Sequence, residues 1–372
     1  PDSLDVDGTP FDIGLYPHLN DYTGPGYYVD PASGNDSTGT GSMGSPFYSI
    51  QSAVNFALDP GDYIEIPPGE YIGNIFIENR SPDIYSTGGW SETILDGDST
   101  GSVLTFINVD SSASLSGFTV RNGSSWYNGY HNNGGGIYLK DADLLLTDLL
   151  IEDNTAIHDG GGIYATYSDA VLDRSIVFNN FSSSEGGGIR AENSSLTVHK
   201  SLVVGNTSVG SGAGIASPYG ALTAVNSIIW HNTRIDGTVD AWNHDKAGAY
   251  SNVEGQTNQN WCEECINEDP LFYNWQDRDF NIPANSRCVN DGIPDSLDVD
   301  GTPFDIGLYP HLNDYTGPGY YVDPASGNDI TGTGSMGSPF YSIQSAVNFA
   351  LDPGDYIEIP PGEYIGNIFI EN

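Results

Sequence analysis

The sequence predicts an all-β fold, a right-handed parallel β-helix whose coils are each about 26 residues long, because marks at a fixed short interval are typical of solenoids. Three observations support this prediction. A glycine-rich mark and an asparagine mark recur at the same constant interval in the middle of the chain. A unit so short cannot bury a face by itself, so successive units must stack. The 47 glycines and 23 tyrosines among 372 residues favour many short strands joined by tight turns over helices.

The two marks keep their spacing over four turns. The glycine mark, two or three glycines followed by isoleucine, begins at Gly134, Gly160, Gly186 and Gly212. The second mark places an apolar residue three positions before Asn154, Asn180, Asn206 and Asn232, with Asn122 as a weaker forerunner. In stacked coils about 4.8 Å apart, equivalent residues form columns. We therefore predict an inward asparagine ladder whose amides bond from coil to coil, and glycines at sharp corners.

The chain also contains a long duplication. Residues 1–79 return as residues 294–372 with a single change, in which Ser37 becomes Ile330 and the sequon at Asn35 is lost. Independent domains would not agree at loop positions, so this identity predicts a tandem array of which the chain is a window. The predicted boundaries are the end of one unit at residues 1–24, a complete unit at 25–317, and the start of the next at 318–372.

The glycine and asparagine marks resemble the β-helix repeats of bacterial surface proteins and are similar to those of the chlamydial polymorphic membrane protein adhesins. The flanking residues resemble the pectate-lyase-like superfamily. In residues 27–36 and 45–54 this resemblance implies an opening strand, a polar loop and a short amphipathic cap helix near residues 47–58. It implies a first coil at residues 62–71. Such a resemblance indicates the fold and does not settle the function.

The charge of the chain restricts its partners. Ten basic and 50 acidic residues give a formal charge of −40, which repels nucleic acid and attracts divalent cations. No apolar run approaches the roughly 20 residues that span a bilayer, so we expect no membrane span in this window. An extracellular or cell-surface bacterial protein fits this composition.

An aspartate-rich loop near residue 300 predicts a structural calcium site. Calcium prefers roughly six to eight oxygen ligands from flexible loops, and the loop resembles those of thrombospondin type 3 repeats. It departs from the EF-hand, because Ser296 and Gly307 stand where an Asp and a Glu are required. The alternative is a polar turn in which the aspartates accept hydrogen bonds from backbone amides. The candidate ligands are Asp291, Asp295, Asp298, Asp300 and Asp305, with Asp2, Asp5, Asp7 and Asp12 in the first copy.

The three cysteines, Cys262, Cys265 and Cys288, lie near the end of the unit. Zinc is disfavoured because it needs a fourth ligand, and no histidine lies between His244 and His311. We predict a disulfide from Cys288 to Cys265, or alternatively to Cys262, which would stabilise the unit end by about 3 kcal/mol. One thiol is left over.

We expect no catalytic site. Polysaccharide lyases on this fold combine acidic calcium ligands with a basic residue, and glycosidases pair carboxylates roughly 5 to 9.5 Å apart. The predicted column of Asp148, Arg174 and Lys200 is better explained as solvated surface. Other candidates lack a recognisable partner motif, namely His131, His158, Asp159 and Glu185.

Two classes of function compete with a polysaccharide-active enzyme. The first is a structural or adhesive extracellular filament or stalk, in which copies of the unit join end to end. The second is a carbohydrate-binding module, whose aromatic residues would stack on surface glycans. Its candidates are Trp126, Tyr127 and Tyr130, within an excursion that lengthens one coil. We favour the filament because the tandem copies are nearly identical.

Overall fold

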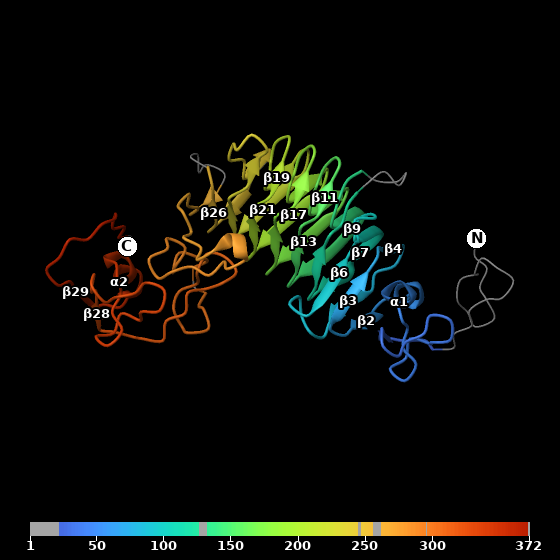
Figure 1. The fold of residues 1–372 in the computed structure, drawn as a ribbon, viewed down its shortest axis with the longest axis horizontal. Coiled ribbons are helices and arrows are strands. Elements are labelled where there is room, and N and C mark those ends of the chain that lie inside the picture. The colour runs from blue at the N-terminus through green and yellow to red at the C-terminus, as the bar shows by residue number, and fades with distance from the viewer. Residues whose placement is uncertain (1–21, 126–131, 245–246, 256–261, 295, 371–372) are drawn as a thin grey trace. The chain divides into compact units, whose positions relative to one another are not determined.

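The computed structural model describes residues 22–125, 132–244, 247–255, 262–294 and 296–370 (Figure 1). The chain divides into two compact units. The first comprises residues 1–199, 203–223 and 231–246, and the second comprises 200–202, 224–230 and 247–372. No helix in the described part is long and apolar enough to cross a membrane.

In its described residues, the first unit consists of strands in three sheets and one helix. One sheet contains β1 (Gly26–Tyr28), β2 (Tyr63–Ile66), β4 (Ile75–Glu78), β5 (Asp83–Ser86), β7 (Leu104–Ser116), β9 (Ile137–Thr147), β12 (Ile163–Thr166), β13 (Asp169–Asp173), β16 (Ile189–Glu192), β17 (Ser195–His199), β20 (Ile215–Ser217) and β24 (Trp242–His244). A second contains β3 (Gly69–Ile72), β6 (Thr93–Asp96), β8 (Thr119–Arg121), β10 (Leu150–Glu152) and β14 (Ile176–Phe178). The third contains β11 (Thr155–Ala156), β15 (Phe181–Ser182), β19 (Thr207–Ser208) and β23 (Thr233–Arg234).

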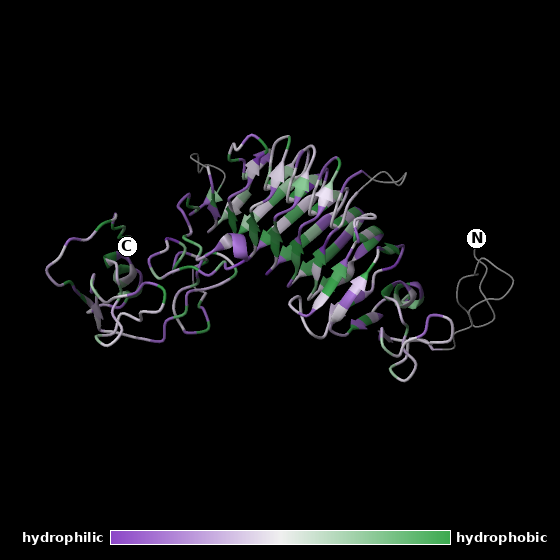
Figure 2. Ribbon diagram, viewed as in Figure 1, coloured by the Kyte–Doolittle hydropathy of each residue, from purple (hydrophilic) through white to green (hydrophobic). Residues whose placement is uncertain are grey.

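The strands of the first unit pair in parallel and stack as in a β-helix, which confirms the predicted class of fold. Ile163 of β12 pairs with Ile137 on one side and Ile189 on the other, so equivalent isoleucines of successive glycine marks align. All three isoleucines are fully buried. The apolar residues of one strand thus continue those of its neighbour, and Figure 2 shows hydrophobic residues along the stacked strands with hydrophilic residues in the turns between them.

The helix α1 (Ile50–Phe56) lies at the start of the first unit, where a cap helix is predicted. The side-chain oxygen of Ser49 accepts a hydrogen bond from Ser52 N and caps the helix. Asp36 holds the preceding turn by accepting from the backbone of both Tyr48 and Ser49 at 2.9 Å. Helix α1 buries Ile50, Ala53 and Val54, and it therefore covers apolar surface at this end of the unit.

The glycine marks form corners that a side chain would block. Gly160 has a φ of +68°, and a Cβ there would lie 2.4 Å from Ile163 O. Gly162 has an ordinary φ, but its Cβ would lie 2.7 Å from Gly188 O in the neighbouring strand layer and 3.0 Å from Asn180 Nδ2. The first glycine is thus required by conformation and the third by the close approach of backbone and asparagine side chain.

Four asparagines form a continuous buried row. The Nδ2 group donates at 2.9–3.0 Å to the Oδ1 atom of the next residue in the order Asn154, Asn180, Asn206, Asn232. The same Oδ1 atoms also accept a backbone hydrogen bond. Asn154 N, Asn180 N and Asn206 N each donate at 3.0 Å to Oδ1 of the next asparagine in the row. The second amide hydrogen of each residue goes to a backbone carbonyl, such as Ile151 O at 2.9 Å from Asn180. The polar atoms of the ladder are therefore satisfied inside the core.

The prediction that Asn122 starts this ladder is wrong. Strand pairing aligns Leu150 with Thr119, so Asn122 falls beside Asp153 and not beside Asn154. Its Nδ2 donates to Asp96 Oδ2 at 2.7 Å, away from the ladder. Gly123 occupies the ladder position, and its backbone N–H caps Asn154 Oδ1 at 2.8 Å.

The described part of the second unit contains short strands, two helices and long connecting loops. Parallel pairs form between β22 (Ile228–Trp230) and β26 (Asn252–Val253), between β25 (Ala247–Ala249) and β27 (Cys262–Glu263), and between β28 (Gly319–Tyr321) and β29 (Tyr356–Glu358). The helices are η1 (Trp275–Asp277) and α2 (Ile343–Phe349). Two strands, β18 (Leu202–Val204) and β21 (Ala221–Val225), contain residues of both units.

Candidate functional site at the repeat junction

Within the second unit, the end of one sequence copy packs against the beginning of the next. We call residues 282–313 the end segment and residues 318–370 the following start. The backbone of the two joins directly, because Ala284 N donates to Asp329 O at 2.8 Å. This contact links a residue of the end segment to the polar loop that precedes helix α2.

The outer face of α2 provides the most specific contacts of the junction. Asn348, 8% exposed, donates through Nδ2 to Ala284 O at 2.8 Å and to Ser286 O at 3.0 Å. In return, the side chain of Asn290 donates to Asn348 O. One helical asparagine thereby satisfies two carbonyl groups of the end segment. Neither Ala284 nor Ser286 belongs to a strand.

A histidine of the end segment packs on the same helix. The rings of His311 and Phe349 lie 5.7 Å apart, and both residues are buried. His311 N donates to Asp305 Oδ2 at 2.6 Å, while its Nδ1 lies 3.0 Å from Ile282 O. Burial lowers the pKa of His311 below its ordinary value. The neutral ring can then donate from Nδ1 to the carbonyl.

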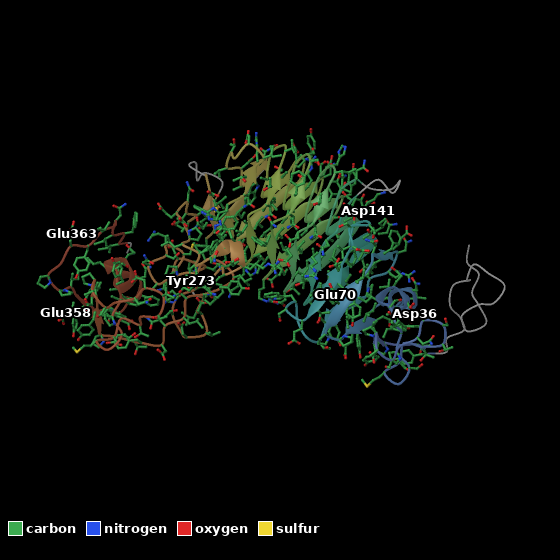
Figure 3. The ribbon with its side chains drawn as sticks, in the orientation of Figure 1. Asp36, Glu70, Asp141, Tyr273, Glu358 and Glu363 are labelled. Atoms are coloured by element: carbon green, nitrogen blue, oxygen red, sulfur yellow. A yellow bond between two sulfur atoms is a disulfide. The ribbon has the colours of Figure 1, made fainter. Side chains whose placement is uncertain are left out.

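Two further hydrogen bonds tie the second unit's loops to the following start. Asn313 Nδ2 donates to Thr333 O at 3.1 Å, and the hydroxyl of Tyr273 (Figure 3) donates to Ile330 O at 3.4 Å. Ile330 is the one residue that differs between the copies. Its backbone N–H bonds to an asparagine side chain just as that of Ser37 does, and nothing in the structure explains the change of side chain.

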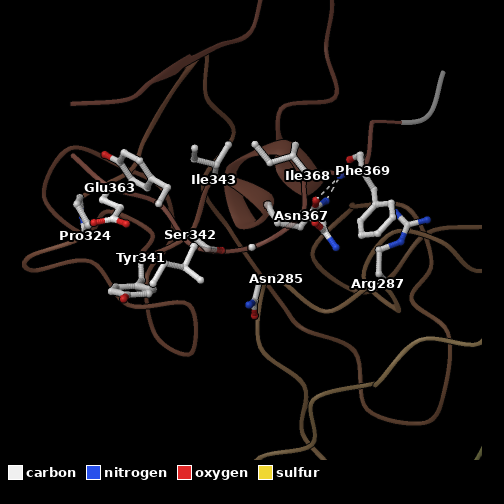
Figure 4. A pocket seen from close by; sticks show the side chains of 14 residues that line it. Asn285, Arg287, Pro324, Tyr341, Ser342, Ile343, Glu363, Asn367, Ile368 and Phe369 are labelled. Carbon is white, nitrogen blue, oxygen red and sulfur yellow. Dashed lines mark hydrogen bonds between the residues drawn. The ribbon is translucent and has the colours of Figure 1, made fainter. Parts of the chain in front are cut away.

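A pocket of about 370 Å³ lies beside this contact (Figure 4). The following start supplies most of its lining, including Gln344, whose Oε1 accepts from Phe369 N at 2.8 Å. The end segment adds Asn285 and Arg287, and the Arg287 guanidinium lies 5.0 Å from the centre of the Phe369 ring. The matching groove beside α1 is smaller, about 260 Å³, and its lining comes from the first copy alone.

The aspartates of the predicted calcium loop bind backbone amides. Asp305 accepts from Asn290 N at 2.7 Å as well as from the backbone of His311. Asp298 Oδ2 accepts from Asp305 N at 2.9 Å, and Asp300 Oδ1 accepts from Thr302 N at 3.1 Å. Asp291 Oδ2 lies 3.8 Å from the Arg287 guanidinium. These contacts are those of the polar-turn alternative. Predicted ligands that lie outside the described residues are Asp295, Asp2, Asp5, Asp7 and Asp12.

In the described ranges, no group of three or more His, Cys, Asp or Glu residues is placed to hold a metal. Beside the loop, however, two buried amide oxygens lack a protein partner, namely Oδ1 of Asn226 and Oδ1 of Asn290. The Asn226 oxygen faces the loop, because a Cβ on Gly292 would lie 2.6 Å from it. Burial raises the pKa of Asp305 to about 8. The loop combines buried carboxyl and amide oxygens, which are the atom types that calcium binds once the carboxyl group is ionised.

The cysteine prediction is wrong in its pairing. The structure joins Cys262 to Cys265, whose Cα atoms lie 5.6 Å apart, and leaves Cys288 buried outside any disulfide. The Cys265 sulfur accepts a hydrogen bond from Ser251 N at 3.3 Å, and the Cys288 sulfur lies 3.2 Å from Asn252 Nδ2. Cys288 thus fills a core position, and burial raises the pKa of its thiol to about 12.

The charged residues weighed for catalysis are engaged in ion pairs or packing. Arg174 binds Asp148 with both side chains about half exposed, which agrees with solvated surface. Lys200 Nζ lies 3.8 Å from the centre of the Phe304 ring. The Arg190 side chain, 11% exposed, lies among three carboxylates that the sequence did not assign to it, those of Asp159, Glu185 and Glu192.

The three glycan-binding candidates and one histidine weighed for catalysis fall in the same stretch of the chain. His131, Trp126, Tyr127 and Tyr130 lie outside the described residues.

The junction residues were missed for a different reason, because Asn348 and Asn55 stand in identical sequence and only the fold distinguishes them. The duplication itself was the available signal, since identical surfaces in an array must meet the same neighbours.

Comparison with known proteins gives one sequence match and several fold matches. The Chlamydia polymorphic membrane protein repeat matches residues 148–166, which include β10 and the second glycine mark. A search of curated sequences returns no match. Because the repeat match covers a small part of the chain, it indicates similarity to these repeats and no more.

The solved structures similar to this chain include pectin-active enzymes. Escherichia coli YbhC is 16% identical with a TM-score of 0.33, covering 79% of this chain and 85% of its own. Rice weevil pectin methyl esterase is 12% identical with a TM-score of 0.32, covering 74% and 88%. Pectate lyase Pel9A is 15% identical with a TM-score of 0.34, covering 77% and 96%. At TM-scores below 0.5 we draw no conclusion about activity from them, and the fold assignment rests on the strand pairing described above.

Proposed function

We propose that this chain is part of a structural, adhesive filament or stalk outside the cell, built from tandem β-helix units that join end to end. The observation that carries the proposal is the junction in the second unit. There, Asn348 of one copy bonds to two carbonyl groups of the preceding end segment. Units linked by such contacts would transmit force along the array instead of swinging freely.

The connection between the copies supports the same proposal. The last contact of the end segment is Asn313, and β28 of the following start begins at Gly319. A linker of so few residues cannot hold two successive repeat units far apart. Near-identical copies would repeat the same contact at every junction, which is how a heterologous interface produces an extended assembly.

The acidic surface suits a protein exposed to solvent and cations. Figure 3 labels three exposed acidic residues of the first unit, Asp36, Glu70 and Asp141. We propose a structural calcium ion in the end segment, where Asp305 and the unpartnered amide oxygens of Asn226 and Asn290 supply ligands of suitable chemistry. Calcium there would neutralise carboxylates that the fold brings together.

The proposal assigns no catalytic role to the chain. The ion pairs of Arg174 with Asp148 and of Arg190 with Glu185 support this, because each of these carboxylates is already engaged by an arginine. Glycan contact by Trp126, Tyr127 and Tyr130 remains a prediction. Loss of glycan-array or cell-adhesion signal in Trp126→Ala would support it, and an unchanged signal would remove it.

Electron microscopy of the native assembly tests the filament directly. We expect fibres with a regular axial repeat set by one sequence period, the interval from Pro1 to Pro294. The same preparation treated with a calcium chelator should lose that regularity if calcium stabilises the junctions. Separate beads joined flexibly, before any chelation, would contradict the proposal and favour independent binding modules.

A further inference from the structure

Helices α1 and α2 have identical sequences, yet their outer faces differ in exposure. In α2, Asn348 is 8% exposed and Phe349 is 4% exposed. In α1, the matching Asn55 is exposed and Phe56 is only half-buried. In α2, the carbonyl groups of Ala284 and Ser286 cover Asn348, and the His311 ring lies on Phe349.

The Asn55 side of α1 has the hydrogen-bond geometry that α2 uses at the junction. Gln51 Nε2 donates to Asn55 Oδ1 at 3.0 Å, as Gln344 does to Asn348 at 2.7 Å. Gln51 Oε1 accepts from Phe76 N at 2.8 Å, the same length as in the second copy. These bonds fix the Asn55 amide, and among the described residues its Nδ2 group has no protein acceptor. Such preorganisation lowers the entropic cost of binding.

We propose that the outer face of α1 binds residues 282–290 of another copy of this repeat. Asn55 would donate to the carbonyl groups of Ala284 and Ser286 of that copy, and the backbone carbonyl of Asn55 would accept from its Asn290. The Arg287 guanidinium would lie over the ring of Phe76, which is 45% exposed. The inference rests on the proposed filament and names the segment that binds this helix face.

The sequence identifies the occupant. The duplicated stretch begins at residue 294 in the second copy and at residue 1 in the first. Residues 282–290 therefore occur once in this chain, and there they are engaged on α2. The proposed occupant of α1 is the same segment of another copy of the repeat.

The test titrates a fluorescently labelled peptide spanning residues 280–293, carrying Cys288→Ser, into the full 372-residue chain and follows fluorescence anisotropy. We expect saturable binding within about 1 mM peptide, the range of weak recognition. Asn55→Asp keeps the side-chain shape but removes both amide donors, and it should weaken binding about fivefold or more. A scrambled peptide should not bind.

The matched control is Asn193→Asp, the same change at an exposed asparagine in the turn after β16, which should leave the affinity unchanged. Circular dichroism melts should agree among the three proteins, because Asn55 and Asn193 are both exposed. Absence of saturable binding, or equal affinity for wild type and Asn55→Asp, would overturn the inference. If the peptide does not bind specifically but electron microscopy shows regular fibres, the filament proposal stands and only this docking site is wrong. If the peptide binds specifically but electron microscopy shows separate beads, the docking site stands and the filament proposal is wrong.

Discussion

Asn180 donates its side-chain amide to Asn206 Oδ1 at 3.0 Å while its own Oδ1 accepts from both nitrogens of Asn154. Each inner member of the row, Asn180 and Asn206, is thus a donor to one asparagine and an acceptor for the other. Because these groups are buried, removing one member leaves several polar atoms without a partner, and the energetic cost falls on the neighbours as well.

Asn180→Ala is expected to lower the free energy of unfolding by about 3 kcal/mol, since it leaves Asn154 without its acceptor and Ile151 O without its donor. Urea unfolding followed by circular dichroism measures the change. The matched control is Asn179→Gly, which loses only an exposed bond to Asp153 and tolerates the φ of 52°. Equal losses in the two variants would contradict the role assigned to the ladder.

Gly162→Ala should destabilise the protein by about 2 to 3 kcal/mol, because its Cβ would meet Gly188 O and the ladder amide of Asn180. Gly44→Ala, where a Cβ meets nothing within 4 Å, should leave the melting temperature unchanged or slightly higher. Differential scanning calorimetry distinguishes the two. If Gly162→Ala leaves the melting temperature unchanged, neighbouring layers can move apart at the corner.

Stability should decrease as pH falls through the titration of Asp96. Burial alone would raise the pKa of Asp96, but hydrogen bonds from Asp98 N, Asn122 and Arg121 lower it below the ordinary value. A folded-state pKa below the unfolded one adds stability above about pH 4, and this is lost as pH falls through the folded pKa. Asp96→Asn should therefore flatten the acid limb of melting temperature against pH. An unchanged limb would show that other groups dominate.

Cys288 should resist alkylation in the native protein, because burial raises the pKa of its thiol to about 12 and excludes the reagent. Mass spectrometry after iodoacetamide treatment should show no adduct in native buffer and one adduct in denaturant without reductant. Adding reductant should give three adducts, the further two on Cys262 and Cys265. A mapped disulfide that includes Cys288 would contradict the observed pairing.

Calcium is expected to bind the end segment and raise the melting temperature, as any ligand specific for the folded state does. Isothermal titration calorimetry should detect binding to the wild type and weaker binding to Asp298→Asn, because Asp298 Oδ2 accepts the backbone N–H of the proposed ligand Asp305. Asp236→Asn, an exposed aspartate of the first unit, serves as the control and should bind calcium as the wild type does. If calcium added to the wild type gives only the heat of dilution, the loop is a polar turn that does not bind calcium.

Sequence periodicity predicted the parallel β-helix well because each column repeats one physical requirement. A glycine such as Gly162 is needed wherever backbone and ladder side chain approach, so its requirement recurs in the sequence. Asn122 was misplaced because Ile151 pairs with Val120 and not with Thr119, a shift of a single position that turns a side chain to the opposite face. Local spacing cannot show this, whereas strand pairing does.

The junction could not be read from sequence for another reason. Asn55 and Asn348 are the same residue in the same local context, and only the end segment distinguishes them. The disulfide was misassigned because loop closure favours distant cysteines, whereas the core accommodates Cys288 and places the other two within bonding distance. Long-range packing decided both outcomes.

The ladder also allows the length of the β-helix to change by whole coils. Every member from Asn154 to Asn206 presents the same donor to one side and the same acceptor to the other, so excising one whole step of the row would bring equivalent groups together again. The remaining row would still begin at Gly123 and end at Asn232. A unit of this kind can grow or shrink in discrete increments while both of its ends, and whatever they attach to, stay the same.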